Sequence, residues 1–451
     1  MSPVSTLRPA SGAPRPYHFP AFSRHRLSNG LTVWLVPLPG RELVNVHLLF
    51  DAGAAAEEEA RAGVASLTAR LLVTGTRSLD AAAFAEATER LGIEVSSESS
   101  WDSARAAFQA LPAYLGEGLA LLAEMVREPR LDPGEFERLK AERLGDIMQA
   151  RSEPGRLADE MFLDSLYVPE TPYHRLGGGT PETVAALTLD DVRAHHAAHY
   201  LPGRAHLIVA GNLDPDAVIG EVEAGLGGWT GAGPGHREIS PLAVGGRRIV
   251  LVDRPDSVQS ELRVGLPGIT RFDPRYFSAT VMAATLGGVF RSYLNLRLRE
   301  ELGYTYGAHA GLDLRRAAGP MSARSAVQTE VTAPALTELV GQLDLIRSSD
   351  PAEEMLREVK DFLIGVFPLR FETTGGVAGA IEPLAIYGLP DDYWQTYRAN
   401  LEAVTAAEVR QAAEEIIDPA ELLCLVVGDA AKIRAELEAT GIGPLEVRSA
   451  E

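Results

Sequence analysis

The chain has 451 residues, about three times the length of a typical domain, so two or more domains are expected. Its formal net charge of −20 argues against nucleic acid or an anionic membrane surface as a partner, because phosphate groups would be repelled. No apolar run is long enough for a membrane span, and residues 1–20 lack the apolar core of a signal peptide. We therefore expect a cytoplasmic protein, or a periplasmic one if a signal has been removed.

The first motif region follows a predicted strand at residues 44–50 and an acidic loop at residues 57–59. Residues 63–76 then predict an apolar helix that ends in a Thr-Gly-Thr turn. Further along, the Asp-Pro pairs at residues 132–133 and 350–351 each predict the start of a long amphipathic helix, with proline in its first turn.

The chain repeats one pattern in its two halves. Thr188 and Thr405 each predict a capped helix start with acidic residues in the first turn. Each predicted helix is followed by a short apolar strand that ends in glycine, at residues 206–211 and 423–428. The threonines and the glycines are separated by the same number of residues, which indicates an internal duplication.

The order of predicted elements favours an α+β fold. Two homologous domains are expected, each a mainly antiparallel sheet with helices packed on one face. Residues 229–247 carry Gly, Pro and Ser without periodicity and predict a linker. We therefore divide the chain into an N-terminal extension at residues 1–20, a first domain at 21–228, the linker, and a second domain at 248–451.

The helix at residues 63–76 resembles the inverted zinc motif of the pitrilysin, insulinase and mitochondrial processing peptidase family of zinc metallopeptidases. In that family the pattern is Gly-x-Ala-His-x-x-Glu-His, followed by Gly-Thr, and two imidazoles one helical turn apart bind zinc. Here the ligand and general-base positions hold Ser66, Ala69 and Arg70, none of which can do that chemistry. The family's third ligand falls at or next to Asp146, and one carboxylate cannot hold catalytic zinc alone.

A second segment, residues 297–307, resembles the family's other signature. There an Arg, and a Tyr seven residues later, bind the backbone carbonyl of the substrate. Arg299 and Tyr306 fit that spacing in the form of the shorter bacterial members, and Arg297 and Tyr304 fit the register of the longer enzymes. We prefer the pair Arg299 and Tyr306. From the residues alone, the same segment predicts a helix end at Gly303 and then a strand in which the tyrosines alternate.

Two other features have plainer interpretations. His195 and His199 have the i, i+4 spacing of a zinc helix, but no adjacent acid supplies a general base. We interpret them, with His196, as a surface or half-buried cluster. Cys424 is the only cysteine and lies in an apolar run, so it is expected to be a buried small hydrophobe.

The resemblance implies a non-catalytic subunit that is inactive alone and forms half of a clam-shell around a peptide. It implies no metal in this chain, and a homologous partner that carries zinc and the general base. One alternative is an inert structural or assembly subunit, like the core proteins of respiratory complexes, which resemble these peptidases. Another is a self-sufficient metalloenzyme that uses His195, His199 and Asp146.

Overall fold

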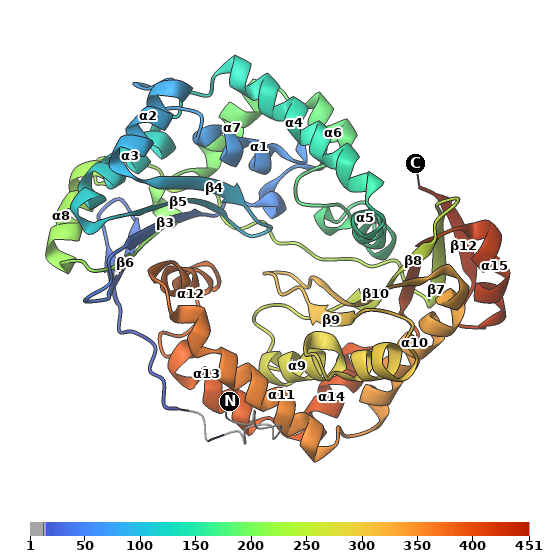
Figure 1. The fold of residues 1–451 in the computed structure, drawn as a ribbon. Helices are drawn as coiled ribbons and strands as arrows, with labels where there is room; N and C mark the ends of the chain where they lie inside the picture. Colours follow the sequence, from blue (N-terminus) through green and yellow to red (C-terminus); the bar gives the residue numbers. More distant parts are fainter. Residues whose placement is uncertain (1–11, 13–14, 451) are drawn as a thin grey trace, which may run out of the picture.

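A computed structural model of the protein describes residue 12 and residues 15–450; the predicted N-terminal extension at residues 1–20 lies mostly outside these described residues. The chain folds into two halves that face each other, each built on a six-stranded sheet (Figure 1). The strands of the first half are β1 (Ser23–Arg26), β2 (Thr32–Pro37), β3 (Val44–Phe50), β4 (Glu94–Ser99), β5 (Ala104–Ala110) and β6 (His206–Gly211). Those of the second half are β7 (Arg248–Asp253), β8 (Gln259–Pro267), β9 (Ala308–Leu312), β10 (Pro320–Gln328), β11 (Leu423–Gly428) and β12 (Leu445–Ser449).

The two sheets have equivalent strand orders, as the internal duplication predicts. The order is β1-β2-β6-β3-β5-β4 in the first half and β12-β7-β11-β8-β10-β9 in the second. In both, the strand that ends in glycine lies parallel to one neighbour and antiparallel to the other: β6 between β2 and β3, β11 between β7 and β8. The predicted α+β class with mainly antiparallel pairing is therefore confirmed, and both sheets are mixed.

Helices surround both sheets. In the first half they are α1 (Val64–Leu72), α2 (Ala81–Leu91), α3 (Leu115–Arg127), α4 (Pro133–Ser152), α5 (Pro154–Leu166), α6 (Pro181–Ala186), α7 (Leu189–His199) and α8 (Pro215–Leu226). In the second half they are α9 (Tyr276–Ala283), α10 (Thr332–Ser348), α11 (Glu353–Val366), α12 (Thr374–Tyr387), α13 (Tyr393–Ala403), α14 (Ala406–Ile416) and α15 (Ala430–Ala439). Two π-helical segments, η6 (Ala284–Gly288) and η7 (Asn295–Glu301), follow α9.

The two threonine-capped helix starts form as predicted. At α7, the Thr188 hydroxyl accepts the N–H of Asp191, and the Asp191 carboxylate accepts the N–H of Thr188. Thr405 and Glu408 make the same reciprocal pair at α14. Each pair satisfies two N–H groups that would otherwise lack partners at the helix end.

The two long helices begin differently from each other. α4 begins at Pro133, with the Asp132 carboxylate as its cap, as predicted. The prediction of a first-turn proline in the second long helix is wrong, because Ala352 keeps an extended backbone and α11 begins after it. The Asp350 carboxylate, which would cap an earlier start, accepts a hydrogen bond from an arginine of α14 instead.

Each half covers the sheet of the other half with one helix. Helix α5 of the first half packs on β8 and β11, and helix α12 of the second half packs on β3 and β6 (Figure 1). Because strand side chains alternate between faces, β3 divides its residues between two cores. Val46 and Leu48 pack in the core of the first half, whereas Leu49 belongs to the core of the second half. Most helices of each half pack on one face of its own sheet, as predicted, and the helix exchanged from the other half covers the opposite face.

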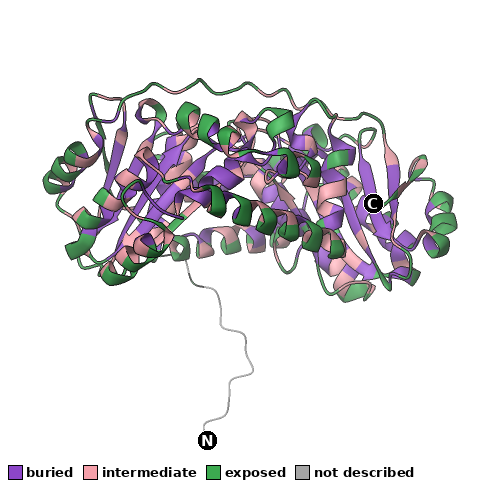
Figure 2. Ribbon diagram, turned by 90° about the horizontal axis from the view of Figure 1, so that it is seen from above, coloured by how far each residue is buried: buried purple, intermediate pink, exposed green. Residues whose placement is uncertain are grey.

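Polar contacts also join the halves across β3. The Asn45 amide donates to the Thr374 hydroxyl at 2.7 Å, and the His47 ring lies 2.6 Å from the Glu382 carboxylate. Arg105 donates to the same carboxylate at 3.1 Å. Figure 2 shows that the strands are mostly buried while the outer helices present exposed faces.

The predicted linker, residues 229–247, lies in the segment between α8 and β7. Residues 227–247 form no helix or strand, apart from an isolated bridge between Ala243 and Tyr167. The Arg237 guanidinium ties this segment to the first half by donating to the Glu57 carbonyl at 2.7 Å. Within the described part of the chain, none of the helices has the length and apolar content that a membrane crossing needs.

Candidate functional site

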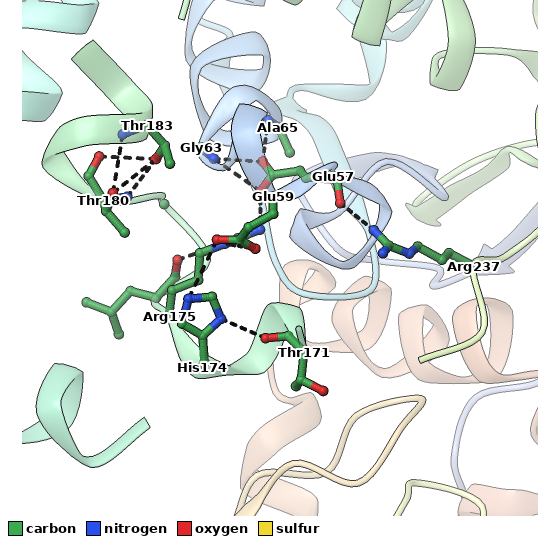
Figure 3. Close-up of polar contacts among 12 residues, drawn as sticks. Glu57, Glu59, Gly63, Ala65, Thr171, His174, Arg175, Thr180, Thr183 and Arg237 are labelled. Atoms are coloured by element: carbon green, nitrogen blue, oxygen red, sulfur yellow. Dashed lines mark hydrogen bonds and ion pairs between the residues drawn. The ribbon is translucent and has the colours of Figure 1, made fainter. Parts of the chain in front are cut away.

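The N-terminus of α1 is held by the buried side chain of Glu57. Its carboxylate accepts the N–H groups of Gly63 at 3.1 Å and Ala65 at 2.8 Å, and the Arg175 guanidinium at 3.1 Å (Figure 3). Burial raises the pKa of Glu57 to about 7, and these donors oppose the rise. A carboxylate at a helix N-terminus also complements the helix dipole. The helix that carries the degenerate zinc motif is therefore anchored by an ion pair.

The backbone conformation of Gly63, which glycine adopts more easily than other residues, permits this anchoring. Its φ of 96° lies in the left-handed region, and a Cβ there would approach the Gly178 carbonyl to 2.9 Å. A larger residue would strain the turn that points the Gly63 N–H at Glu57.

The structure brings the degenerate zinc-motif positions of α1 next to α4. The Arg70 guanidinium lies 3.2 Å from the Asp146 carboxylate and 3.6 Å from that of Glu142. Ser66 is partly buried one turn earlier, and Ala69 is fully buried. A fixed cation therefore lies against the carboxylate of Asp146, the residue predicted at or next to the third-ligand position. Among residues 12 and 15–450, no group of three or more His, Cys, Asp or Glu is arranged to hold a metal ion.

The second motif begins on the π-helical segment η7 and ends in a loop. Gly303, with φ of 65°, lies just after the helical segment, as predicted. The prediction that Tyr304 and Tyr306 are strand residues is wrong, because β9 begins only at Ala308. The Thr305 hydroxyl accepts the N–H of Gly307 and donates to the Gly307 carbonyl. These local hydrogen bonds compete with strand pairing, which accounts for the loop.

Arg297 and Tyr304 are both engaged within the protein. The Arg297 guanidinium makes a bidentate ion pair with Glu338 at 2.8 and 2.9 Å, and also binds Glu301 at 2.8 Å. These pairs raise the pKa of Arg297 and lower that of Glu338. Tyr304 is half-buried against the core of the second half.

Arg299 and Tyr306 are much less engaged. The acid nearest to the Arg299 guanidinium is Glu300, at 3.6 Å, and the guanidinium also lies 4.4 Å from the centre of the Phe290 ring. Tyr306 is 95% exposed. Both side chains therefore have hydrogen-bonding capacity left for a ligand.

Asn295 fixes the position of this loop, although it was not among the residues predicted to form the site. Its buried amide donates to the carbonyls of Val289 at 3.3 Å and Ala308 at 2.9 Å. Its oxygen accepts the N–H of Ala308 at 2.9 Å. A short uncharged polar residue between Leu294 and Leu296 was the available signal.

The histidines on α7 form a largely buried cluster. The rings of His195 and His199 lie 4.6 Å apart, and His196 bonds the Val126 carbonyl at 2.8 Å. Burial lowers the pKa of His195 to about 3. Asp146 lies on α4 and forms no metal-holding group with the histidines among the described residues, so the alternative metal site has no support.

Cys424 is the second residue of β11 and is fully buried, which confirms its interpretation as a buried small hydrophobe. Burial raises the pKa of its thiol to about 12. A thiol of such high pKa is unreactive at neutral pH.

Two family models match the chain. Residues 32–174 match the model described as Insulinase (Peptidase family M16), and residues 186–363 match the Peptidase M16 inactive domain. The chain belongs to peptidase family M16. Among M16 relatives, a "non-peptidase homolog YmxG" from Helicobacter pylori is 24% identical over 367 residues, 81% of this chain and 84% of the relative. An "uncharacterized zinc protease" from Mycobacterium bovis is 25% identical over 400 residues, 87% of this chain and 90% of the relative.

Solved structures agree with the M16 fold. The peptidase M16 inactive domain from Pseudomonas fluorescens has a TM-score of 0.83 at 25% identity, covering 90% of this chain and 98% of that one. A protease from Helicobacter pylori has a TM-score of 0.85 at 19% identity, covering 91% and 100%. A chain of complex III2 from Candida albicans has a TM-score of 0.76 at 15% identity, covering 93% and 99%. At these lower identities the likeness is one of fold alone.

Proposed function

We propose that this M16 chain is the non-catalytic subunit of a two-subunit zinc peptidase and contributes Arg299 and Tyr306 to substrate binding. A homologous partner with an intact His-x-x-Glu-His motif supplies zinc and the general base. The observation that carries the proposal is a contrast between two motifs. Arg70 is paired with Asp146 where a metal site is expected, whereas Arg299 and Tyr306 have few partners within the chain.

The chemistry of the pair suits a peptide carbonyl. A guanidinium and a phenol both donate hydrogen bonds, and together they stabilise negative charge as it develops on the carbonyl oxygen. Arg297 and Tyr304 are less suited, because the Arg297 donors already bind Glu338 and Glu301. We therefore assign substrate binding to the pair Arg299 and Tyr306.

The relative called a non-peptidase homolog supports a chain without peptidase activity of its own. The alternative of an inert scaffold, which the fold likeness to complex III2 raises, gives no role to the exposed Tyr306 or to the weakly paired Arg299. A peptidase whose chemistry is divided between two subunits accounts for both the missing metal site and the weakly paired Arg299 and Tyr306.

The test is reconstitution. The purified chain is expected to cleave no unstructured fluorogenic peptide alone, and cleavage should begin when a zinc-bearing M16 homologue from the same genome is added. A chelator should then stop it. Cleavage by this chain alone, with stoichiometric zinc bound to it, would overturn the proposal, as would a partner whose activity this chain does not change.

A further inference from the structure

Arg271 is a buried cation without a counter-ion among the described residues. In this part of the chain four arginines are almost fully buried, and Arg271 is 8% exposed. The other three each contact a carboxylate: Arg175, Arg263 and Arg315. No Asp or Glu of residues 12 and 15–450 lies within ion-pair distance of the Arg271 guanidinium. Removing a guanidinium from water is costly unless an anion compensates its charge, and here the described chain supplies none.

The contacts that the structure describes for the Arg271 guanidinium are with neutral groups. It donates to the Tyr393 hydroxyl at 2.6 Å, and it lies 4.1 Å from the centre of the Tyr276 ring and 5.0 Å from that of Tyr393. Burial raises the pKa of Tyr393, so its phenol is neutral and supplies no negative charge. Attraction to the two rings offsets only part of the cost of desolvation. Most of the N–H donors of the guanidinium have no acceptor within the described residues.

Arg271 lines a pocket of about 320 Å³, which we call the Arg271 pocket. The pocket lies between the segment that joins β8 to α9 and the segment that joins α12 to α13. Its other walls are mainly aromatic: Phe272, Tyr276, Phe277, Tyr387 and Tyr393. The backbone of Arg271 is fixed, because its N–H donates to the Arg315 carbonyl at 2.8 Å. The guanidinium is therefore held among the rings before a ligand enters.

The charge and the walls of the Arg271 pocket favour one kind of anion. A single guanidinium balances one negative charge, and its planar fork matches a carboxylate. A phosphate dianion is less suited, because Asp273, Asp391 and Asp392 lie on the same two segments and would repel it. The aromatic walls would shield from water an apolar group attached to the carboxylate.

We infer that the Arg271 pocket binds a carboxylate attached to an apolar or aromatic group, in the form of a small organic acid or the C-terminus of a peptide. The Arg271 guanidinium holds the carboxylate, and the rings cover the apolar group. Neither Arg299 nor Tyr306 lines this pocket. The inference therefore goes beyond the proposed function and does not depend on it.

The experiment is isothermal titration calorimetry of the full chain alone with phenylpropanoate, its neutral amide and inorganic phosphate. The carboxylate should bind roughly tenfold to a hundredfold more tightly than the amide, because the amide cannot make a hydrogen bond between two charged groups. Arg271→Met should remove that difference. The matched control is Arg434→Met, which removes one positive charge outside the pocket and should leave the difference unchanged.

Thermal unfolding gives a second measurement that needs no ligand. Because Arg271 has no counter-ion among the described residues, Arg271→Met should keep or raise the melting temperature. Arg263→Met should lower it, because Asp159 and Glu261 lose their partner. A melting temperature of Arg271→Met as low as that of Arg263→Met, or failure of Arg271→Met to fold, would contradict the inference.

Equal affinities of the unchanged chain for phenylpropanoate and its amide would overturn the inference, as would phosphate binding as tightly as the carboxylate. N-acetyl-Ala-Phe with a free C-terminal carboxylate distinguishes the two sources. Tighter binding than phenylpropanoate would support the site with a peptide C-terminus as its ligand, and weaker binding would support it with a small organic acid.

Discussion

Replacement of Glu57 tests how the degenerate motif helix is held. The Glu57→Gln variant keeps the shape of the side chain but removes the charge that faces Arg175, whose own side chain is 2% exposed. Removing one partner of a buried ion pair typically costs about 3–5 kcal/mol. Arg175 keeps a second acid, Glu59, at 3.3 Å, so we expect the lower end, about 3 kcal/mol. In a domain of this size that lowers the melting temperature by roughly 6–12 °C.

The assay is thermal and urea unfolding at pH 8, above the pKa of about 7 for Glu57, where the carboxylate is ionised. Glu59→Gln is the matched control, because that side chain is 49% exposed and its loss should cost about 1 kcal/mol or less. A double variant with Arg175→Met should lose less than the sum of the single variants, since no buried charge is left unpaired. Equal stability of Glu57→Gln and Glu59→Gln would refute the reasoning.

Two further predictions concern α7 and the erased motif. The His195 pKa is lowered to about 3 in the folded protein, so the unfolded chain binds the extra proton as pH falls below about 6.5 and stability is lost there. At pH 5 this histidine lowers the free energy of unfolding by about 2 kcal/mol relative to neutral pH. Urea titrations should show a smaller fall in the free energy of unfolding on acidification for His195→Phe than for the unchanged chain. If Arg70 occupies a former ligand position beside Asp146, three substitutions should create zinc binding near one ion per chain: Ser66→His, Ala69→Glu and Arg70→His. Metal analysis after dialysis checks this, and a metal-free triple variant would contradict the placement.

Local patterns in the sequence predicted much of the fold. The apolar runs that end at Gly211 and Gly428 are strands with the expected bounds. A central strand that is buried on both faces is apolar at nearly every position, so its bounds can be read from the sequence. The caps at Thr188 and Thr405 formed because a threonine and an acid three residues later satisfy each other locally. Repetition of these local signals made the duplication visible.

The exchange of α5 and α12 between the halves could not be predicted in this way. It depends on contacts between distant segments, such as the hydrogen bond from the Asn45 amide to the Thr374 hydroxyl. Such contacts do not change the hydrophobic periodicity of either segment. The same limit applies to the site. Two Arg/Tyr registers had equal spacing in the sequence, and the structure separates them mainly by contacts between distant segments, such as the ion pair of Arg297 with Glu338 and the packing of Tyr304 on the core of the second half.

The central claim is that Arg299, and not Arg297, binds the substrate of an active pair. The most direct measurement is kcat/KM of the reconstituted pair with Arg299→Ala or Arg297→Ala in this chain. Loss of a donor that stabilises the developing oxyanion should lower kcat/KM by roughly 10²- to 10³-fold for Arg299→Ala. Arg297→Ala should lower the melting temperature, through the lost pair with Glu338, and leave kcat/KM near that of the unchanged pair. Unchanged turnover with Arg299→Ala, or a larger loss with Arg297→Ala, would contradict the account.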